Sequence, residues 1–316
     1  MNIPDEKDRI LADIKAMASK VKLMSLLRRI DEASLQGRFK DALVDSLRAI
    51  KMDPDSVNTL YYHATILMSL QRFEDAALAY EKVLAIDPKH TDAQYFLAAI
   101  NRKAVPERAP ESYVTALFDG YSGRFDSELI DKLRYNVPAD LLATIRLLPD
   151  ALNNKLDILD LGCGTGLCGA VFADFASTLV GVDLSGRMIA KSRERGIYTE
   201  LIKSDISAAL QQYEGDFDLI LAGDVFIYIG NLDRIFPLAV TCLRPGGLLA
   251  FSIEVCESDE NYLLRTSGRY AQSPEYIQRL ADNSGFSVLA SNPAVLRYER
   301  GQPINGIIFV LGNGAD

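Results

Sequence analysis

Short apolar segments alternate with longer amphipathic segments from residue 156 to residue 312. This alternation is typical of strands and helices that follow one another, as in an α/β domain. The predicted strands are 156–162, 178–183, 198–204, 217–224, 248–254, a strand that starts at 286–289, and 306–312. The predicted helices are 168–175, 186–196, 232–243 and 274–284. The order predicts a doubly wound parallel sheet of seven strands, covered by helices on both faces.

The first third of the chain instead repeats one helical pattern. Residues 37–54, GRFKDALVDSLRAIKMDP, align with residues 71–88, QRFEDAALAYEKVLAIDP, at a period of 34 residues. Each copy ends in Asp-Pro, and the residue before a proline disfavours the helical conformation, so a helix is predicted to end there. A 34-residue period with small, aromatic and proline residues at these places resembles the tetratricopeptide repeat, a stacked pair of helices.

The repeat register predicts an all-α domain. We expect a flanking helix near 5–18, a first repeat helix near 23–35, and a terminal helix over 91–101. Two roles stay open for this domain. It could dock a protein partner or a second copy of the chain, or it could be a short solenoid that only stacks and caps the next domain.

The stretch VPERAP at 105–110 carries two prolines and interrupts the helical pattern. We therefore predict the repeat domain over 1–105, a linker with pre-domain helices over 106–155, and the sheet domain over 156–316. Within the linker region, a helix is predicted to end near Pro138.

Acidic residues outnumber basic ones and give the chain a formal net charge of −9. The excess falls in the sheet domain, which therefore lacks the basic surface that nucleic-acid backbones require. No apolar run reaches the roughly 18 residues that span a bilayer. The first residues, MNIPDEKDRI, are charged and do not resemble a signal peptide. We expect a cytoplasmic protein that binds neither nucleic acid nor membrane.

The positions of the histidines and cysteines limit which catalytic or metal-binding groups the sheet domain can have. Both histidines, His63 and His90, lie in the repeats, so the sheet domain has no imidazole, the commonest general base. No metal site is expected, because the cysteines lack the spacing of a zinc site and are expected to pack in the interior. The cysteines are Cys163, Cys168, Cys242 and Cys256.

The first predicted strand runs into a glycine-rich turn, LDILDLGCGTGLCG at 156–169. In a doubly wound fold the ligand binds at the carboxyl ends of the strands, and glycine lets the backbone approach it closely. Read from Gly162, the dinucleotide pattern G-x-G-x-x-G would need glycine at 167, where Leu167 stands. Read from Gly164, Gly169 completes the pattern, so a nicotinamide dinucleotide stays a weak alternative. The fuller pattern is acid-x-G-x-G-x-G, from Asp160 to Gly166.

DLGCGTG at 160–166 resembles the first motif of the class I S-adenosylmethionine-dependent methyltransferases. The resemblance covers about residues 111–312 and includes Asp183 after the second strand, Asp205 after the third, and the LRPGG turn at 243–247. Together with the repeats, the chain resembles a bacterial group of methyltransferases that carry tetratricopeptide repeats. The resemblance implies a Rossmann-like seven-stranded sheet and S-adenosylmethionine as the cofactor.

The resemblance also implies roles for individual residues. Gly162 and Gly164 would let the backbone approach the cofactor, Asp183 would accept from the ribose hydroxyls, and Asp205 would accept from the adenine amino group. A tight turn without a ligand and helix caps are the alternatives for these positions. The full set expected to bind the cofactor is Tyr121, Gly162, Cys163, Gly164, Asp183, Leu184, Met188, Asp205, Ile206 and Asp224.

The segment 255–273 lies where this fold commonly builds a lid over the substrate. An arginine there could clamp a carboxylate or phosphate, although a solvated surface arginine is the ordinary alternative. The expected acceptor residues are Arg265, Arg269, Tyr270 and Arg297. The candidates for a general base are Asp224, Tyr228 and Glu254.

The prediction is a methyltransferase that acts on a small-molecule acceptor, with the repeats used for docking, dimerisation or gating. Methyl transfer is an in-line displacement, so positioning can supply much of the acceleration. Three alternatives remain: a protein methyltransferase that recruits its target through the repeats, a scaffold that binds the cofactor without catalysis, and a nicotinamide enzyme.

Overall fold

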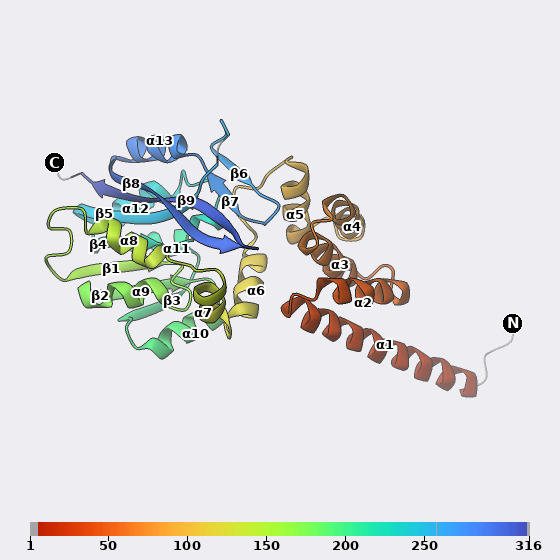
Figure 1. Ribbon diagram of the computed structural model, residues 1–316. Coiled ribbons are helices and arrows are strands. Elements are labelled where there is room, and N and C mark those ends of the chain that lie inside the picture. The colour runs from red at the N-terminus through yellow and green to blue at the C-terminus, as the bar shows by residue number, and fades with distance from the viewer. Residues whose placement is uncertain (1–5, 257, 315–316) are drawn as a thin grey trace. The chain divides into compact units, whose positions relative to one another are not determined.

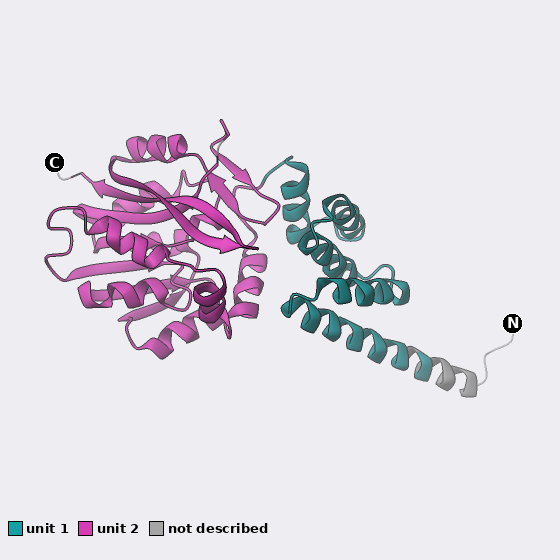
Figure 2. Cartoon of the chain, in the orientation of Figure 1, with its two compact units in different colours: residues 1–105 teal, residues 106–316 magenta. Residues whose placement is uncertain are grey.

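The computed structural model describes residues 6–256 and 258–314. The chain divides into two compact units, which Figure 2 distinguishes by colour. Unit 1 is Met1–Val105 and unit 2 is Pro106–Asp316. The helices that follow Pro106 therefore belong to the same compact unit as the sheet.

Unit 1 consists of helices that pack against their neighbours in sequence. They are α1 Glu6–Leu35, α2 Phe39–Met52, α3 Val57–Ser69, α4 Phe73–Ile86 and α5 Thr91–Asn101 (Figure 1). Ala42 and Ala76, at equivalent places in the two repeats, are fully buried. Their small side chains let neighbouring helices approach closely, as the repeat pattern predicts.

One expectation for unit 1 is wrong. Helix α1 is a single element of 30 residues, where the sequence predicted a flanking helix and a separate first repeat helix. Residues 18–23 contain neither glycine nor proline, so no residue there ends the helix.

Unit 2 is built on a seven-stranded sheet in the order β3-β2-β1-β4-β5-β9-β8. The strands are β1 Leu156–Leu161, β2 Ala176–Asp183, β3 Glu200–Lys203, β4 Phe217–Ala222, β5 Leu243–Glu254, β8 Phe286–Glu299 and β9 Gln302–Asn313. The first five are parallel, but β9 runs antiparallel to both β5 and β8. The expectation of a wholly parallel sheet is therefore wrong at this edge. A short turn at 300–301 joins β8 to β9, and only antiparallel neighbours can be joined so tightly.

Helices cover both faces of this sheet (Figure 1). The core on one face joins strand residues such as Leu159 to α11 Ile206–Leu210, α12 Ile235–Cys242 and α13 Pro274–Ser284. The core on the other face joins Ile158 and its neighbours to α8 Val137–Ile145 and α9 Leu167–Phe172. Residues 158 and 159 face opposite cores because successive side chains of a strand alternate. Helix α10 Gly186–Arg195 packs against β2 and β3.

The segment before β1 is helical, as expected, but its details differ. It holds α6 Glu111–Tyr121, the short α7 Phe125–Ser127, and a π-helical turn, η1 Glu128–Lys132. Pro138 is the second residue of α8 instead of lying at the end of a helix. Proline suits this place because the first turn of a helix needs no backbone N–H donor.

Three further short elements lie near the carboxyl ends of the strands or beside α9. They are the 3-10 turns η2 Ala173–Phe175 and η3 Phe226–Tyr228, and a small hairpin of β6 Tyr262–Leu264 and β7 Tyr270–Gln272. The hairpin occupies the segment 255–273, for which a lid was expected.

Candidate active site

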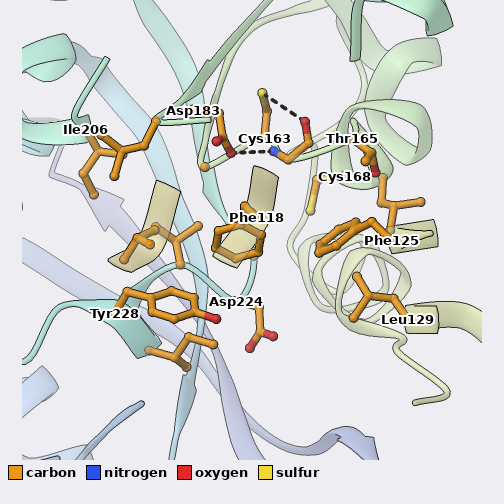
Figure 3. A pocket seen from close by; sticks show the side chains of 18 of the residues that line it. Phe118, Phe125, Leu129, Cys163, Thr165, Cys168, Asp183, Ile206, Asp224 and Tyr228 are labelled. Atoms are coloured by element: carbon orange, nitrogen blue, oxygen red, sulfur yellow. Dashed lines mark hydrogen bonds between the residues drawn. The ribbon is translucent and has the colours of Figure 1, made fainter. Parts of the chain in front are cut away.

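A pocket opens at the carboxyl ends of β1, β2 and β4, and all of its lining belongs to unit 2 (Figure 3). Its empty volume is about 1140 Å³, part of which is open to solvent. The place is the one that the doubly wound topology predicts.

The pocket has two ends that differ in their chemistry. After the roles expected from the sequence, we call the part lined by the glycine turn, Asp183 and the residues after β3 the cofactor end. On the same basis, we call the part lined by Asp224, Tyr228 and Arg269 the acceptor end. Phe118 lies between the two ends, as Figure 3 shows.

The glycine turn has backbone angles that favour glycine. Gly162 has φ of 61° and Gly164 has φ of 55°, both in the left-handed region. A Cβ on Gly162 would lie 2.5 Å from a methyl carbon of Val225, whereas one on Gly164 would meet nothing nearer than Phe125 at 3.8 Å. Close packing therefore explains Gly162. Gly164 instead leaves bare backbone at the cofactor end.

Asp183 ties this turn to the end of β2. Its two carboxylate oxygens accept hydrogen bonds from the backbone N–H groups of Gly164, at 2.9 Å, and Ser185, at 2.7 Å. Burial raises the pKa of Asp183, and these two hydrogen bonds oppose the rise. Each oxygen accepts more than one hydrogen bond in ordinary geometry, so the carboxylate keeps capacity for hydroxyl donors in the pocket.

Asp205 caps a helix and also lines the pocket. It caps α11, accepting from the backbone N–H of Ser207 at 3.0 Å and of Ala208 at 3.3 Å. It also pairs with Arg108, and both side chains line the pocket. Burial alone would raise the pKa of Asp205, but Arg108 and the two backbone donors outweigh it and lower the pKa.

Most of the residues expected from the sequence come together in this pocket. Those that line it are Gly162, Cys163, Gly164, Asp183, Leu184, Asp205, Ile206, Asp224, Tyr228, Arg269 and Arg297. Burial raises the pKa of both pocket cysteines, Cys163 and Cys168, so their thiols stay neutral and do not act as nucleophiles.

Five expected residues do not line the pocket, among them the base candidate Glu254, which is buried and pairs with Arg265 and Arg297. Tyr121 is 38% exposed at the end of α6, with the guanidinium of Arg124 over its ring. Met188 lies in the first turn of α10 and is fully buried. Arg265 donates to Glu254 and to the backbone carbonyl of Val255. Tyr270 is fully buried and donates its hydroxyl to the carbonyl of Pro106 at 2.7 Å.

Arg297, expected to clamp a substrate anion, is already held by acids of the chain. It is only 1% exposed, and its three guanidinium nitrogens donate to Asp224, Glu254 and Glu299. Both oxygens of Asp224 lie 3.0 Å from one of these nitrogens. Asp224 has φ of 60°, a strained backbone angle that in an ordered site is a pointer to function.

Arg269 and Tyr228 complete the acceptor end. Arg269 pairs with Glu299, which it shares with Arg297, and hydrogen-bonds Tyr228. Burial raises the pKa of Tyr228, although Arg269 opposes the rise. The phenol is therefore protonated at neutral pH, so it can donate a hydrogen bond but is poorly suited to act as a general base.

Sequence reasoning missed the apolar cover of the pocket. Phe118 contacts both Phe125 and Tyr228 edge-on, with ring centroids 5.8 Å and 5.5 Å apart. Leu129 and Leu133 continue this wall. The only signal in the sequence is the aromatic cluster at 118–125, from which Tyr121 was expected to contact the cofactor. The structure instead places Phe118, one helical turn before Tyr121, in the pocket lining.

Polar contacts tie this cover to the cofactor end. The hydroxyl of Ser185 donates to Asp119, and the hydroxyl of Thr165 donates to Asp126, each at 2.5 Å. Arg195 also pairs with Asp126. The segment from α6 to α7 is thus fixed over the glycine turn.

The described residues lack two features, a metal-binding cluster and a membrane-spanning helix. Residues 6–256 and 258–314 contain no group of three or more His, Cys, Asp or Glu side chains that could hold a metal ion. In that same part of the chain, no helix has the length and apolar character needed to cross a membrane.

Comparison with known proteins assigns both units to families. Residues 158–247 match the family described as a methyltransferase domain, and residues 27–91 and 61–105 match the family described as a tetratricopeptide repeat. The solved structure of magnesium protoporphyrin IX methyltransferase from Synechocystis PCC 6803 is 15% identical, covering 65% of this chain and 99% of that one with a TM-score of 0.50. This last likeness shows the fold.

Several relatives are methyltransferases. The ubiquinone biosynthesis O-methyltransferase of Chelativorans sp. (strain BNC1) is 32% identical, covering 49% of this chain and 70% of the relative. The protein of the same name from Agrobacterium fabrum is 28% identical, covering 42% of this chain and 60% of the relative. The trans-aconitate 2-methyltransferase of Paracidovorax citrulli is 31% identical, covering 30% of this chain and 38% of the relative. The chain thus spans less than two thirds of the length of the last two.

The fold and these matches define an α/β methyltransferase with the Rossmann-like sheet that the sequence predicted. The chain belongs to the S-adenosylmethionine-dependent methyltransferases and carries tetratricopeptide repeats in unit 1.

Proposed function

We propose that unit 2 binds S-adenosylmethionine at the cofactor end and transfers its methyl group to a small molecule at the acceptor end. One observation carries this proposal: the glycine turn, Asp183, Ile206 and Asp224 line a single pocket under an aromatic cover. The names of the relatives, which include O-methyltransferases of small molecules, support the same class of reaction.

The residues of the cofactor end fit this cofactor. Asp183 has oxygen lone pairs for the two ribose hydroxyls, and Gly164 leaves space for the amino-acid end. Leu184 and Ile206 give apolar surfaces for the adenine, and Asp205 an acceptor for its amino group. When bound, the cofactor supplies a methyl group on a sulfonium that carries its own leaving group.

The acceptor end favours a molecule with an apolar body and one polar reacting group. Its aromatic and aliphatic walls suit apolar surface. The network of ion pairs that includes Arg269, Arg297 and Asp224 balances its charges, with three arginines paired to three carboxylates. An acceptor with a large net charge would therefore be poorly neutralised. We infer that Tyr228 and Arg269 orient the reacting group by donating hydrogen bonds, and that Asp224 accepts its proton where one must leave.

The aromatic cover favours a free small molecule over a side chain of a folded protein target. A side chain still attached to a folded protein would have to pass Phe118 and Phe125, whose neighbours Asp119 and Asp126 are tied to Ser185 and to the glycine turn, respectively. A role for the repeats in docking, dimerisation or gating stays a separate proposal.

Titration calorimetry with S-adenosylmethionine, S-adenosylhomocysteine and NADH tests the cofactor assignment. We expect the two sulfur ligands to bind and NADH not to bind. Asp183→Ala should weaken binding by roughly 10- to 100-fold, because hydrogen bonds to a charged group contribute about 1.5–3 kcal/mol. Asp174→Ala, an exposed position outside the pocket lining, is the matched control and should bind like the wild type. Binding of NADH alone would overturn the proposal.

A further inference from the structure

The side chain of Arg108 is not needed to hold its own segment of unit 2 in place. The backbone on either side of Arg108 is fixed by hydrogen bonds to the η3 turn and the residues after it. The N–H of Ala109 donates to the carbonyl of Tyr228 at 2.9 Å. The carbonyl of Glu107 accepts from the N–H of Gly230 at 2.7 Å. The guanidinium of Arg108 is therefore available for a separate contact.

That contact is an ion pair with Asp205, which lies 97 positions further along the chain. The terminal nitrogen Nη2 of Arg108 donates to Oδ2 of Asp205. The other oxygen of Asp205, Oδ1, accepts from the two backbone N–H groups at the start of α11. Arg108 and Asp205 both line the pocket. The ion pair thus lies at the cofactor end, where Asp205 is expected to meet the amino group of the adenine.

Part of the donor capacity of Arg108 is unused within the chain. Its Nε is buried and has no hydrogen-bond partner among residues 6–256 and 258–314. Buried N–H groups of native proteins are nearly always hydrogen-bonded, because an unpaired group loses its contact with water and gains nothing in return. Since Arg108 lines the cofactor end, a ligand that fills this end can supply the missing acceptor.

The ion pair sets a hydrogen-bond acceptor beside a donor. Burial would raise the pKa of Asp205, but Arg108 and the backbone donors lower it, so the carboxyl group is ionised. An ionised carboxylate only accepts hydrogen bonds, and a guanidinium only donates them. A ligand edge that satisfies both groups carries a donor next to an acceptor. Adenine has such an edge, because its amino group is flanked by the ring nitrogens N1 and N7, which are acceptors.

We propose that Arg108 recognises the adenine of the cofactor together with Asp205, by donating a hydrogen bond to the ring nitrogen beside the amino group. Asp205 accepts from the amino group, and the ring nitrogen is N1 or N7. The inference rests on the proposed function in one respect, that an adenosyl group occupies the cofactor end. It adds a cofactor-binding residue that lies before the sheet in the sequence, outside the motifs that follow the strands.

Titration calorimetry of the full chain with three ligands tests this contact. The ligands are S-adenosylhomocysteine and its 1-deaza and 7-deaza analogues, in each of which carbon replaces one ring nitrogen. The wild-type chain should bind one analogue about 10- to 100-fold more weakly than S-adenosylhomocysteine, because a hydrogen bond from a charged donor is lost. The other analogue should bind within about twofold of S-adenosylhomocysteine, and this difference identifies the nitrogen that Arg108 contacts.

The variant Arg108→Ala tests whether Arg108 is the donor. It should bind S-adenosylhomocysteine about 10- to 100-fold more weakly than the wild type, and should bind all three ligands alike within about twofold. The ratio of affinities within one protein does not depend on the fraction that is folded, so a loss of stability cannot imitate this result. Arg244→Ala is the matched control. Arg244 is 40% exposed and pairs with Asp157 and Asp218, but it does not line the pocket, so this variant should rank the ligands as the wild type does.

Three outcomes would overturn the inference and leave the proposed function standing. One is a wild-type chain that binds all three ligands alike, and the second is one that binds both analogues equally weakly. The third is an Arg108→Ala variant that ranks the ligands as the wild type does, which would assign the contact to another donor. A wild-type chain that binds none of the three ligands would overturn both the inference and the proposed function. The predicted ranking without any methyl transfer would support the inference and overturn only the proposed reaction.

Discussion

The two ends of the pocket are built differently, although they share one cavity. The cofactor end comes from short segments that each follow directly after a parallel strand: the glycine turn after β1, Asp183 and Leu184 after β2, and Asp205 and Ile206 after β3. The acceptor end joins distant parts of the chain, with Asp224 after β4, Arg297 in β8 and Arg269 in the β6–β7 hairpin. The first end is thus a property of local motifs, and the second is a property of tertiary assembly.

This difference also appears in how the two ends hold charge. At the acceptor end, buried Arg297 is satisfied by three carboxylates. Beneath the cofactor end, Asp160 is 1% exposed, and its described side-chain partner is the neutral hydroxyl of Tyr198, at 2.6 Å. A buried charge without a counterion is expensive, whereas a buried pair is costly mainly when one partner is removed.

Removing Arg297 should have the largest effect on stability. Arg297→Ala leaves Asp224 without its arginine partner and leaves Glu254 with Arg265 alone, and it should lower the free energy of unfolding by about 3–5 kcal/mol. Urea denaturation measures this change. Arg265→Ala, at a partly exposed member of the same network, should cost clearly less. Equal costs for the two substitutions would contradict the view that Arg297 centres the acceptor end.

The buried carboxyl of Asp160 should make stability depend on pH. Burial raises the pKa of Asp160 to about 7, and the hydrogen bond from Tyr198 opposes the rise. The unfolded chain has the ordinary value of about 3.9, so the folded state binds more protons between these values. The contribution of Asp160 is therefore fully present below about pH 4 and is lost as the pH rises to about 7, by up to roughly 4 kcal/mol.

Asp160→Asn should flatten the fall of unfolding free energy with pH over this window. Tyr198→Phe removes a hydrogen bond that favours the charged form, and so should move the window to higher pH. Urea denaturation at several pH values measures both effects. An Asp160→Asn variant with the wild-type slope would show that Asp160 titrates normally, and the contrast in charge between the two ends would then be lost.

The two glycines of the turn should give smaller and separable effects. Gly162→Ala places a Cβ against Val225 and should destabilise the fold by about 1–3 kcal/mol. Gly164→Ala meets only the cost of positive φ, about 1 kcal/mol, but adds a methyl group at the cofactor end and should weaken S-adenosylhomocysteine binding. Thermal melts and calorimetry separate the two effects. If the double variant Gly162→Ala/Val225→Ala is no more stable than the single variant Gly162→Ala, the packing explanation for Gly162 is wrong.

The sequence predicted which residues gather at the cofactor end of the pocket, because its signals are local. The acid and glycines of 160–166 and the acids at 183 and 205 each follow an apolar segment at the expected spacing, and parallel strands bring such segments to one edge. The sheet and helical repeats were predictable for the same reason, because their periodicities are short. The prediction of a break between two helices before residue 23 was wrong. The repeat register suggested a helix boundary there, but the residues at that place include no helix breaker.

The acceptor end could not be predicted in the same way. Arg297 and Glu254 lie 43 positions apart, and their pairing depends on the antiparallel insertion of β9 between β5 and β8. The pattern of the sequence indicated strands there but not their order. Whether an arginine binds a substrate or an acid of its own chain is decided by this order, so Arg265 and Arg297 were expected to contact substrate but are held by Glu254 and its neighbours.

The most direct test of the central claim is to find where the methyl group goes. The full chain is incubated with S-adenosylmethionine labelled on the methyl group and a cell extract, and the products are separated by size, with Asp183→Ala as the inactive control. The account predicts label in the small-molecule fraction that is absent with the variant. Label confined to protein would contradict it, and would favour a methyltransferase that recruits a protein target.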